Sequence, residues 1–128
     1  MRTGFNKFGR GRRRVPGEMN KTEAAYALHL EHRKKCGVIE WFAYEGIKIK
    51  LADKTFFTPD FAVMLPDGLI ELHDVKGTTR DKVTKKSKPF VHDDGATIKI
   101  KVAAELYPFV FVVAWFDKAS GMWLENRY

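Results

Sequence analysis

Asp60, Asp74 and Lys76 lie in one short stretch of the sequence, TFFTPDFAVMLPDGLIELHDVKG, which covers residues 55–77. Asp60 and Asp74 each occupy a place in a β-like run where an apolar residue would suit a strand better, and Lys76 follows Asp74 by two residues. Carboxylate oxygens bind hard cations such as Mg²⁺, and a nearby lysine can stabilise developing negative charge. The alternative is an ordinary polar rim, in which Lys76 and an arginine neutralise the acids.

A Pro-Asp-Gly turn at residues 66–68 predicts a β-hairpin that sets how the two acids face each other. If these three residues form the loop, Asp60 lies directly opposite Asp74, with Cβ atoms roughly 4.5–5.5 Å apart. A two-residue loop would shift this register by one place. Like charges directly opposite one another destabilise a strand pair, and a divalent cation bridging them would offset that cost.

Alternation along the second strand separates its polar residues into two sets. Lys76 shares the face of Asp74, whereas His73 and Glu71 point to the opposite face. We therefore interpret His73 as a surface histidine and Glu71 as an unlikely metal ligand.

Glu23 supplies a third carboxylate, and two interpretations of it remain open. The segment Asn20–Glu23 resembles a capping box, in which the glutamate only reaches back to the helix start. Glu23 also heads a helical stripe that continues through Tyr26, Ala27 and Leu30 and should lie against the sheet. In that position its carboxylate could point at the two aspartates.

The surrounding pattern predicts a mixed sheet flanked by helices, in the order αβββαβ with a further edge strand. This is an α/β or α+β fold in one domain, residues 19–128, preceded by an arm at 1–18. We expect residues 77–93 to be irregular. The predicted helices cover 21–35 and a segment from 93 or 94 to before Pro108, and the predicted strands cover 41–51, 55–65, 69–76, 109–116 and 122–128.

Basic residues around the predicted sheet are candidates for phosphate contacts. In the second helix Lys99 heads a stripe of Val102, Ala103 and Leu106, whereas Lys101 shares its stripe with Glu105 and should be more solvated. A snorkelling lysine at a helix edge is the competing interpretation of Lys99. The full set of predicted DNA-binding residues is Lys99, Lys101, Arg10, Arg12, Arg13, Arg14, Lys85 and Lys86.

The net charge of +7 comes mostly from the arm, where six cations precede the first acid, Glu18. A glycine-spaced arginine segment, GRGRRR, suggests phosphate binding, and the alternative is a tail that only improves solubility. With one cysteine, Cys36, the chain forms no internal disulfide and no multi-cysteine metal cage. The longest apolar run, 109–116, is too short to cross a membrane, and no secretory signal is evident, so we expect a cytoplasmic protein without a membrane partner.

The motif TPDF, followed after about a dozen residues by HDVKG, resembles the PD-(D/E)xK nuclease superfamily. The resemblance covers roughly residues 20–116. The helix that bears Glu23, the hairpin and the later segment IKIKVAAELYP together are similar to small phage-encoded members, in particular the endonuclease I type of Holliday junction resolvase. The acid in the DxK motif is Asp74, where glutamate is commoner, and residues 77–93 and the arm match nothing in the pattern.

This resemblance implies a restriction-endonuclease-like core and metal-dependent hydrolysis of DNA phosphodiesters. Asp60 and Asp74 would bind Mg²⁺ or Mn²⁺, Glu23 would be a further ligand, and Lys76 would orient the attacking water. Branched DNA would be one substrate, in recombination or processing of phage DNA within a bacterial host. A junction resolvase would need two active sites and hence a homodimer. The alternatives are a catalytically inactive nucleic-acid-binding module and a small basic protein that binds another protein.

Overall fold

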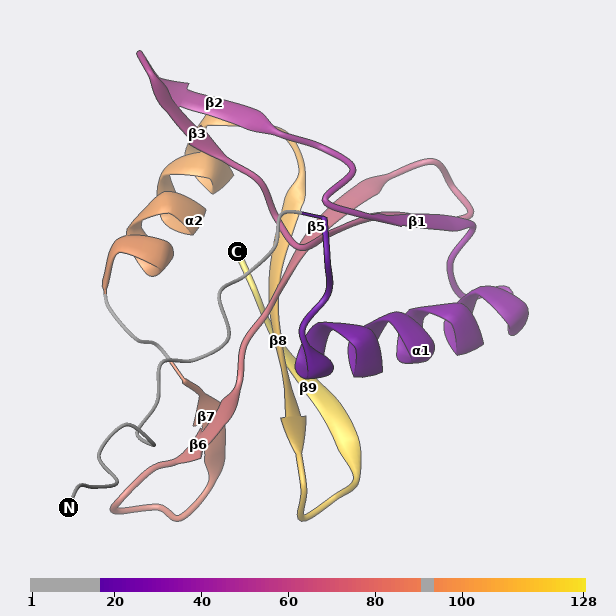
Figure 1. The fold of residues 1–128 in the computed structure, drawn as a ribbon, viewed down its shortest axis with the longest axis vertical. Helices are drawn as coiled ribbons and strands as arrows, with labels where there is room; N and C mark the ends of the chain where they lie inside the picture. Colours follow the sequence, from indigo (N-terminus) through magenta and orange to yellow (C-terminus); the bar gives the residue numbers. More distant parts are fainter. Residues whose placement is uncertain (1–16, 91–93) are drawn as a thin grey trace, which may run out of the picture.

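A five-stranded mixed sheet forms the centre of the computed structural model, which describes residues 17–90 and 94–128 (Figure 1). The strand order is β1-β4-β5-β8-β9, and two small two-stranded sheets, β2–β3 and β6–β7, flank it. The protein is a single small α+β domain with two helices in the described ranges. The elements are α1 Lys21–Lys35, β1 Trp41–Tyr44, β2 Ile49–Ala52, β3 Thr55–Phe57, β4 Phe61–Met64, β5 Ile70–Val75, β6 Thr78–Arg80, β7 Ser87–Pro89, α2 Asp94–Leu106, β8 Val110–Asp117 and β9 Met122–Arg127.

The sheet is antiparallel except between β5 and β8, which run parallel. A parallel pair needs a long crossover, and here the connection contains the β6–β7 hairpin and α2. β8 is hydrogen-bonded on both sides and its residues 111–115 are buried, as the continuous apolar run predicts. β9 forms the edge of the sheet, which confirms the prediction for the last strand.

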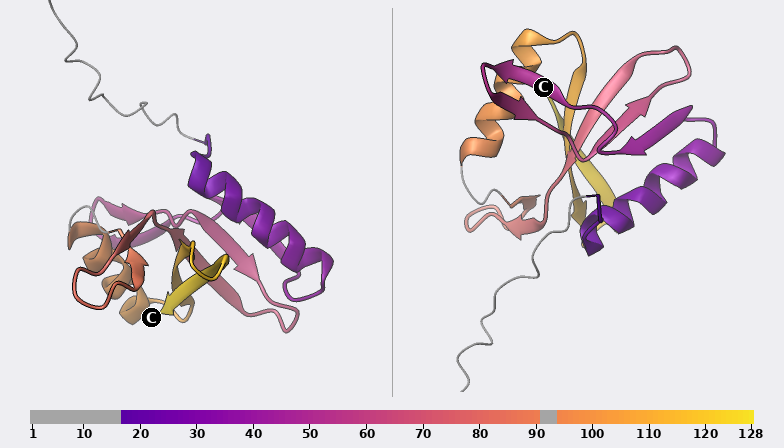
Figure 2. Two further views of the ribbon diagram at one scale, coloured as in Figure 1. Left: turned by 90° about the horizontal axis from the view of Figure 1, so that it is seen from below. Right: turned by 45° about the horizontal axis from the view of Figure 1, so that its top comes forward.

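The two helices cover opposite faces of the sheet, and Figure 2 shows this from a second direction. On the face of α1, Tyr26 and Leu30 lie against Phe61 and Val63 of β4. The alternate residues of the same strands point the other way. They form a second core on the side of α2. Its members are Ile49, Ala62, Leu72, Ile100, Ala103, Phe111 and Val113.

Both helices have the limits that the sequence predicts. The Asn20 side chain accepts a hydrogen bond from the Glu23 backbone N–H at 2.8 Å, and the Asn20 N–H donates to the Glu23 carboxylate at 3.0 Å, which completes a capping box. After the C-cap Cys36, Gly37 adopts φ +77°, the left-handed conformation that ends many helices. α2 begins at Asp94 and ends at Leu106, before Pro108.

Two predicted strands are each divided in the structure. The run at 41–51 forms β1 and β2, which belong to different sheets, because Glu45 turns the chain with φ +49°. The run at 55–65 forms β3 and β4, separated by Thr58–Asp60. Gly46 and Pro59 lie in these two breaks, and neither residue favours the interior of a strand. The β2–β3 hairpin leaves the main sheet and packs on α2, where the Tyr107 hydroxyl donates to the Lys50 carbonyl oxygen at 2.6 Å.

The prediction of an irregular segment at 77–93 is wrong for the part that the structure describes. β6 and β7 pair antiparallel, and the Asp81 carboxylate accepts hydrogen bonds from the backbone N–H groups of Val83 and Thr84 in the turn between them. Residues 91–93 lie outside the described ranges. The segment lacks the apolar alternation of a half-buried strand, because both faces of this small hairpin are largely polar.

His73 is a buried residue, and its prediction as a surface histidine is wrong. Its ring is 0% exposed, because α1 covers this face of β5. Nδ1 shares a hydrogen bond of 2.6 Å with the Tyr26 hydroxyl, and Nε2 lies 2.9 Å from the Glu71 carboxylate. Arg127 on β9 pairs with the other carboxylate oxygen, and the His73 and Arg127 interactions lower the pKa of Glu71 despite its burial. This network joins α1, β5 and β9.

Substituting Tyr26 with phenylalanine should lower the free energy of unfolding by about 1–3 kcal/mol, because Nδ1 of His73 would remain buried without its partner. Equilibrium denaturation in urea measures the change. Tyr128→Phe is the matched control, since this ring is exposed, and we expect an effect within about 0.5 kcal/mol. Equal stability of Tyr26→Phe and the control would show that the hydrogen bond contributes nothing.

No helix in the described parts of the chain has both the length and the apolar character needed to cross a membrane.

Candidate functional site

The β4–β5 hairpin has the register that the three-residue turn predicts. Phe61 pairs with His73 and Ala62 with Leu72, and the Leu65 N–H donates to the Leu69 carbonyl oxygen at 2.9 Å across the turn. One further step along this register brings Asp60, just before β4, opposite Asp74. The sequence therefore gave the correct relation between the two acids, although it placed Asp60 inside a longer strand.

Hydrogen bonds to both the side chain and the backbone of Asp60 hold it in place. Asp60 is 7% exposed, and its carboxylate accepts a hydrogen bond from the Val75 N–H at 2.8 Å. Its carbonyl oxygen accepts a bond from the Glu45 N–H at 2.7 Å. These bonds hold the segment between β3 and β4 against β5, so the carboxylate has a defined position at the end of the hairpin.

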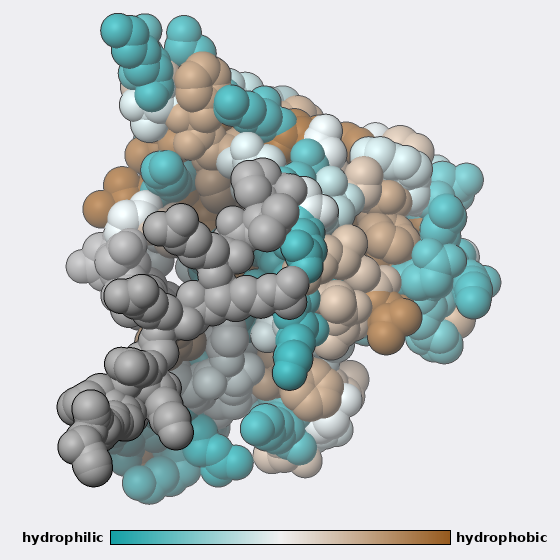
Figure 3. Space-filling model, in the orientation of Figure 1, coloured by the Kyte–Doolittle hydropathy of each residue, from teal (hydrophilic) through white to brown (hydrophobic). Residues whose placement is uncertain are grey.

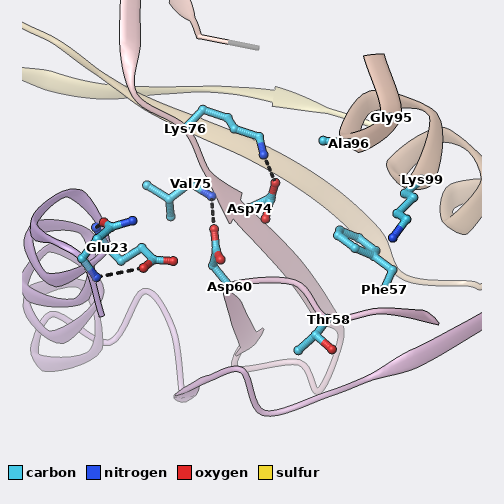
Figure 4. Close-up of a pocket in the computed structure, with 11 residues that line it drawn as sticks. Glu23, Phe57, Thr58, Asp60, Asp74, Val75, Lys76, Gly95, Ala96 and Lys99 are labelled. Atoms are coloured by element: carbon cyan, nitrogen blue, oxygen red, sulfur yellow. Dashed lines mark hydrogen bonds and ion pairs between the residues drawn. The ribbon is translucent and has the colours of Figure 1, made fainter. Parts of the chain in front are cut away.

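Asp74 lies beside Asp60 and forms an ion pair with Lys76. The residue is 8% exposed, and Oδ2 lies 2.6 Å from Nζ of Lys76, as drawn in Figure 4. The lysine side chain remains 23% exposed. Lys76 is thus placed to neutralise one carboxylate and still reach solvent at the mouth of the site.

Burial raises the pKa of Asp60 far above its ordinary value, and the neighbouring charge of Asp74 raises it further. The hydrogen bond from Val75 acts in the opposite direction, whereas hydrogen bonds with Glu23 and Asp74 favour the protonated Asp60. Two acids that approach this closely out of water are costly to ionise together. Ionising both aspartates would therefore place more negative charge here than Lys76 alone neutralises.

Glu23 fits both interpretations offered by the sequence. It completes the capping box at the start of α1, and its carboxylate also accepts a hydrogen bond from the Tyr44 hydroxyl at 3.2 Å. The residue is 2% exposed, and it interacts with Asp60. Three carboxyl groups from α1, the start of β4 and β5 thus meet at one place. Tyr44 was not anticipated, because nothing in the sequence separates it from the other aromatic residues of its strand.

A cavity of about 500 Å³ opens beside these carboxylates. Gly95 and Ala96, in the first turn of α2, lie across it from Lys76 (Figure 4). Lys99 also lines it, and its Nζ donates to the Phe56 carbonyl oxygen at 3.4 Å. The first-turn N–H groups of a helix and a lysine both favour an anion such as a phosphate.

The prediction that Lys99 heads a buried helical stripe of Val102, Ala103 and Leu106 is partly wrong. Val102 and Leu106 are exposed, and α2 instead buries Ile100 and Ala103 against the sheet. Lys99 nevertheless reaches the cavity, because it lies on the side of the helix that faces the β2–β3 hairpin.

The other predicted DNA-binding residues lie elsewhere or outside the described ranges. Lys101 is exposed and is not among the residues that line the cavity. Lys85 and Lys86 are exposed on the β6–β7 hairpin, beside a separate hollow that includes Asp117. Arg10, Arg12, Arg13 and Arg14 fall within residues 1–16, which the structure does not describe.

The predicted metal ligands are Asp60, Asp74 and Glu23. Within residues 17–90 and 94–128, no group of three or more His, Cys, Asp or Glu side chains is arranged to hold a metal ion. At Glu23, Oε1 accepts hydrogen bonds from the Asn20 N–H and the Tyr44 hydroxyl. Asp60 and Asp74 fit a hard divalent cation by chemistry and position, and Glu23 as a third ligand stays a prediction.

Comparisons of the chain with protein-family models, with curated proteins and with solved structures found no match. The interpretation of the site therefore depends on its own geometry and chemistry.

Proposed function

We propose that this protein is an endonuclease that hydrolyses phosphodiester bonds in DNA with Mg²⁺ or Mn²⁺. One observation carries the proposal: Asp60 and Asp74 are both buried at the end of the same hairpin, next to Lys76 and an open cavity. A polar rim would leave such acids in water. Burial of two carboxylates with one close lysine is instead typical of a site that receives a cation.

The donor chemistry favours Mg²⁺ or Mn²⁺ over a softer metal, because the residues offer only carboxylate oxygens. When bound, such an ion would polarise the phosphate and lower the pKa of a coordinated water. Its charge would also offset the repulsion from Asp74, which adds to burial in raising the pKa of Asp60. The protein would thus be most stable, and its site most ordered, with the cation present.

The residues around the carboxylates would bind and orient a phosphodiester. Lys76 extends from the end of β5 and could place its ammonium group where charge develops on the phosphate. Lys99 and the first turn of α2 approach from the other side of the cavity. A DNA strand that crosses the cavity would then meet cationic groups on both sides of the acids.

The competing function is an inactive module that binds nucleic acid through its basic residues alone. Such a module gains nothing from a buried acid pair, which repels the DNA backbone and costs folding free energy. We therefore favour catalysis. Action on branched DNA and assembly into a dimer are narrower proposals that rest on the sequence resemblance.

Incubation with a panel of DNA structures tests the function. The substrates are linear duplex, single-stranded, flap and four-way junction DNA, each with Mg²⁺, with Mn²⁺ and with EDTA. We expect cleavage of at least one substrate in the presence of metal and none with EDTA, because the carboxylates require a cation to act on a phosphodiester. Binding without cleavage of any substrate would favour the inactive module.

A further inference from the structure

A second hollow, of about 680 Å³, lies along the β6–β7 hairpin and includes none of the carboxylate site. Its size falls in the range of about 300–1,000 Å³ that is usual for ligand pockets. Cationic and apolar side chains line it together: Arg80, Lys82, Lys88, Val83, Pro89 and Phe90.

The hairpin carries a clear excess of positive charge. Five cations and one acid, Asp81, occur between residues 78 and 90. Lys88 lies 3.8 Å from Asp81, which also accepts two backbone hydrogen bonds in the turn. Asp117 adds one more acid on the side of Lys85. Two acids against five cations leave the hairpin positive, so the hollow suits an anionic ligand. Figure 3 shows hydrophilic residues at the tip of this hairpin, at the lower edge of the view.

Exposed apolar groups distinguish this hollow from a merely solvated basic surface. Phe90 is 50% exposed and Val83 is 87% exposed. A half-exposed aromatic ring beside several cations can accept a stacked base while the cations contact its phosphate. Paired bases in a duplex cannot offer their faces in this way, so the combination favours an unpaired nucleotide.

The hairpin is attached firmly to the sheet next to the carboxylates. The Thr78 hydroxyl donates to the Phe116 carbonyl oxygen at 2.7 Å, and the Trp115 indole N–H donates to the Ser87 hydroxyl at 3.3 Å. At the base of the hairpin, the Phe90 N–H bonds to the Gly77 carbonyl oxygen at 2.7 Å. Gly77 directly follows Lys76, so the hollow and the carboxylate site are joined through one short backbone connection.

We propose that this hollow binds an unpaired DNA nucleotide next to the phosphate that is cleaved, with the base against Phe90 and its phosphate near Arg80, Lys82 and Lys88. The identity of the ligand as DNA rests on the proposed function. Recognition of this kind would direct the enzyme to DNA that has a single-stranded segment beside the scissile bond.

Binding measured without cleavage tests the proposal. The full chain is titrated in EDTA against fluorescently labelled oligothymidylate of about ten nucleotides, and against a duplex of the same length, with anisotropy as the readout. Phe90→Leu should weaken oligothymidylate binding roughly tenfold, because leucine has no π face, and leave duplex binding almost unchanged. Phe90→Tyr, which keeps the ring, should bind oligothymidylate as the wild type does.

Two matched controls separate this site from general effects. Trp41→Leu removes a half-exposed ring at the start of β1 and should leave binding unchanged. Replacing Arg80 and Lys82 with glutamine should lower the salt slope for oligothymidylate by about 1.4, whereas the same change at Lys34 and Lys35, at the end of α1, should not. Thermal unfolding of each variant confirms that the fold is kept.

The outcomes distinguish this inference from the proposed nuclease. Unchanged oligothymidylate binding by Phe90→Leu, or equal losses for single strand and duplex, would overturn the inference even if the protein cleaves DNA. Dependence on Phe90 in a protein that cleaves no DNA would instead support the hollow and contradict the nuclease.

Discussion

Asp74→Asn should lower Mg²⁺-dependent DNA cleavage by more than about a hundredfold, because it removes one of the two carboxylates expected to hold the cation. Asparagine has nearly the same shape, and the hydrogen bond that Val75 donates goes to Asp60, so the fold should persist. Initial rates on the best substrate of the DNA panel measure the loss, and circular dichroism reports the fold.

Asp67→Asn is the control for this variant. It makes the same chemical change in the same hairpin, but in the turn, where the side-chain oxygen of asparagine can still accept the bond from the Leu69 N–H. We expect its cleavage rate to match the wild type. Cleavage by Asp74→Asn at the wild-type rate would show that the activity does not depend on this site.

Asp60→Asn should stabilise the metal-free protein, and the gain should grow with pH. Burial and the nearby Asp74 raise the folded-state pKa of Asp60 above its ordinary value of 3.8. The folded protein then holds a proton that the unfolded chain releases, so the free energy of unfolding of the wild type falls as pH rises above the unfolded pKa and toward the folded pKa. Asparagine does not titrate, and its side-chain oxygen can still accept the Val75 bond.

Urea denaturation in EDTA at several pH values measures this difference. We expect the variant to match the wild type at acidic pH and to exceed it by about 1–3 kcal/mol at mildly alkaline pH. Asp53→Asn, at an exposed turn, should show no such divergence. Parallel pH profiles for Asp60→Asn and the wild type would show that Asp60 ionises without cost.

Adding Mg²⁺ should reverse the order of the two proteins. A cation that binds only the folded wild type adds stability by mass action, and Asp60→Asn would lose most of this gain together with the ligand. Thermal unfolding with increasing Mg²⁺ gives this comparison directly, and it needs no substrate.

The sequence alone determined the helix ends and the hairpin register, because residues close by in the chain set them. The capping box and Gly37 set both ends of α1, because caps act within a few residues. The turn at 66–68 set the hairpin register and with it the relation of Asp60 to Asp74. Register follows from loop length, so it needs no knowledge of the rest of the fold.

Only the tertiary structure decided which polar residues are buried and what they contact. Alternation correctly put His73 on the face opposite Asp74, but it could not show that α1 covers that face. Gly46 and Pro59 are local signs of the breaks at Glu45 and at Thr58–Asp60, but only the structure shows that the chain leaves one sheet for another there. Burial depends on segments distant in sequence, and no local pattern reports it. For the same reason the hairpin at 78–89 and its basic hollow appear only once β6 and β7 are placed against β8.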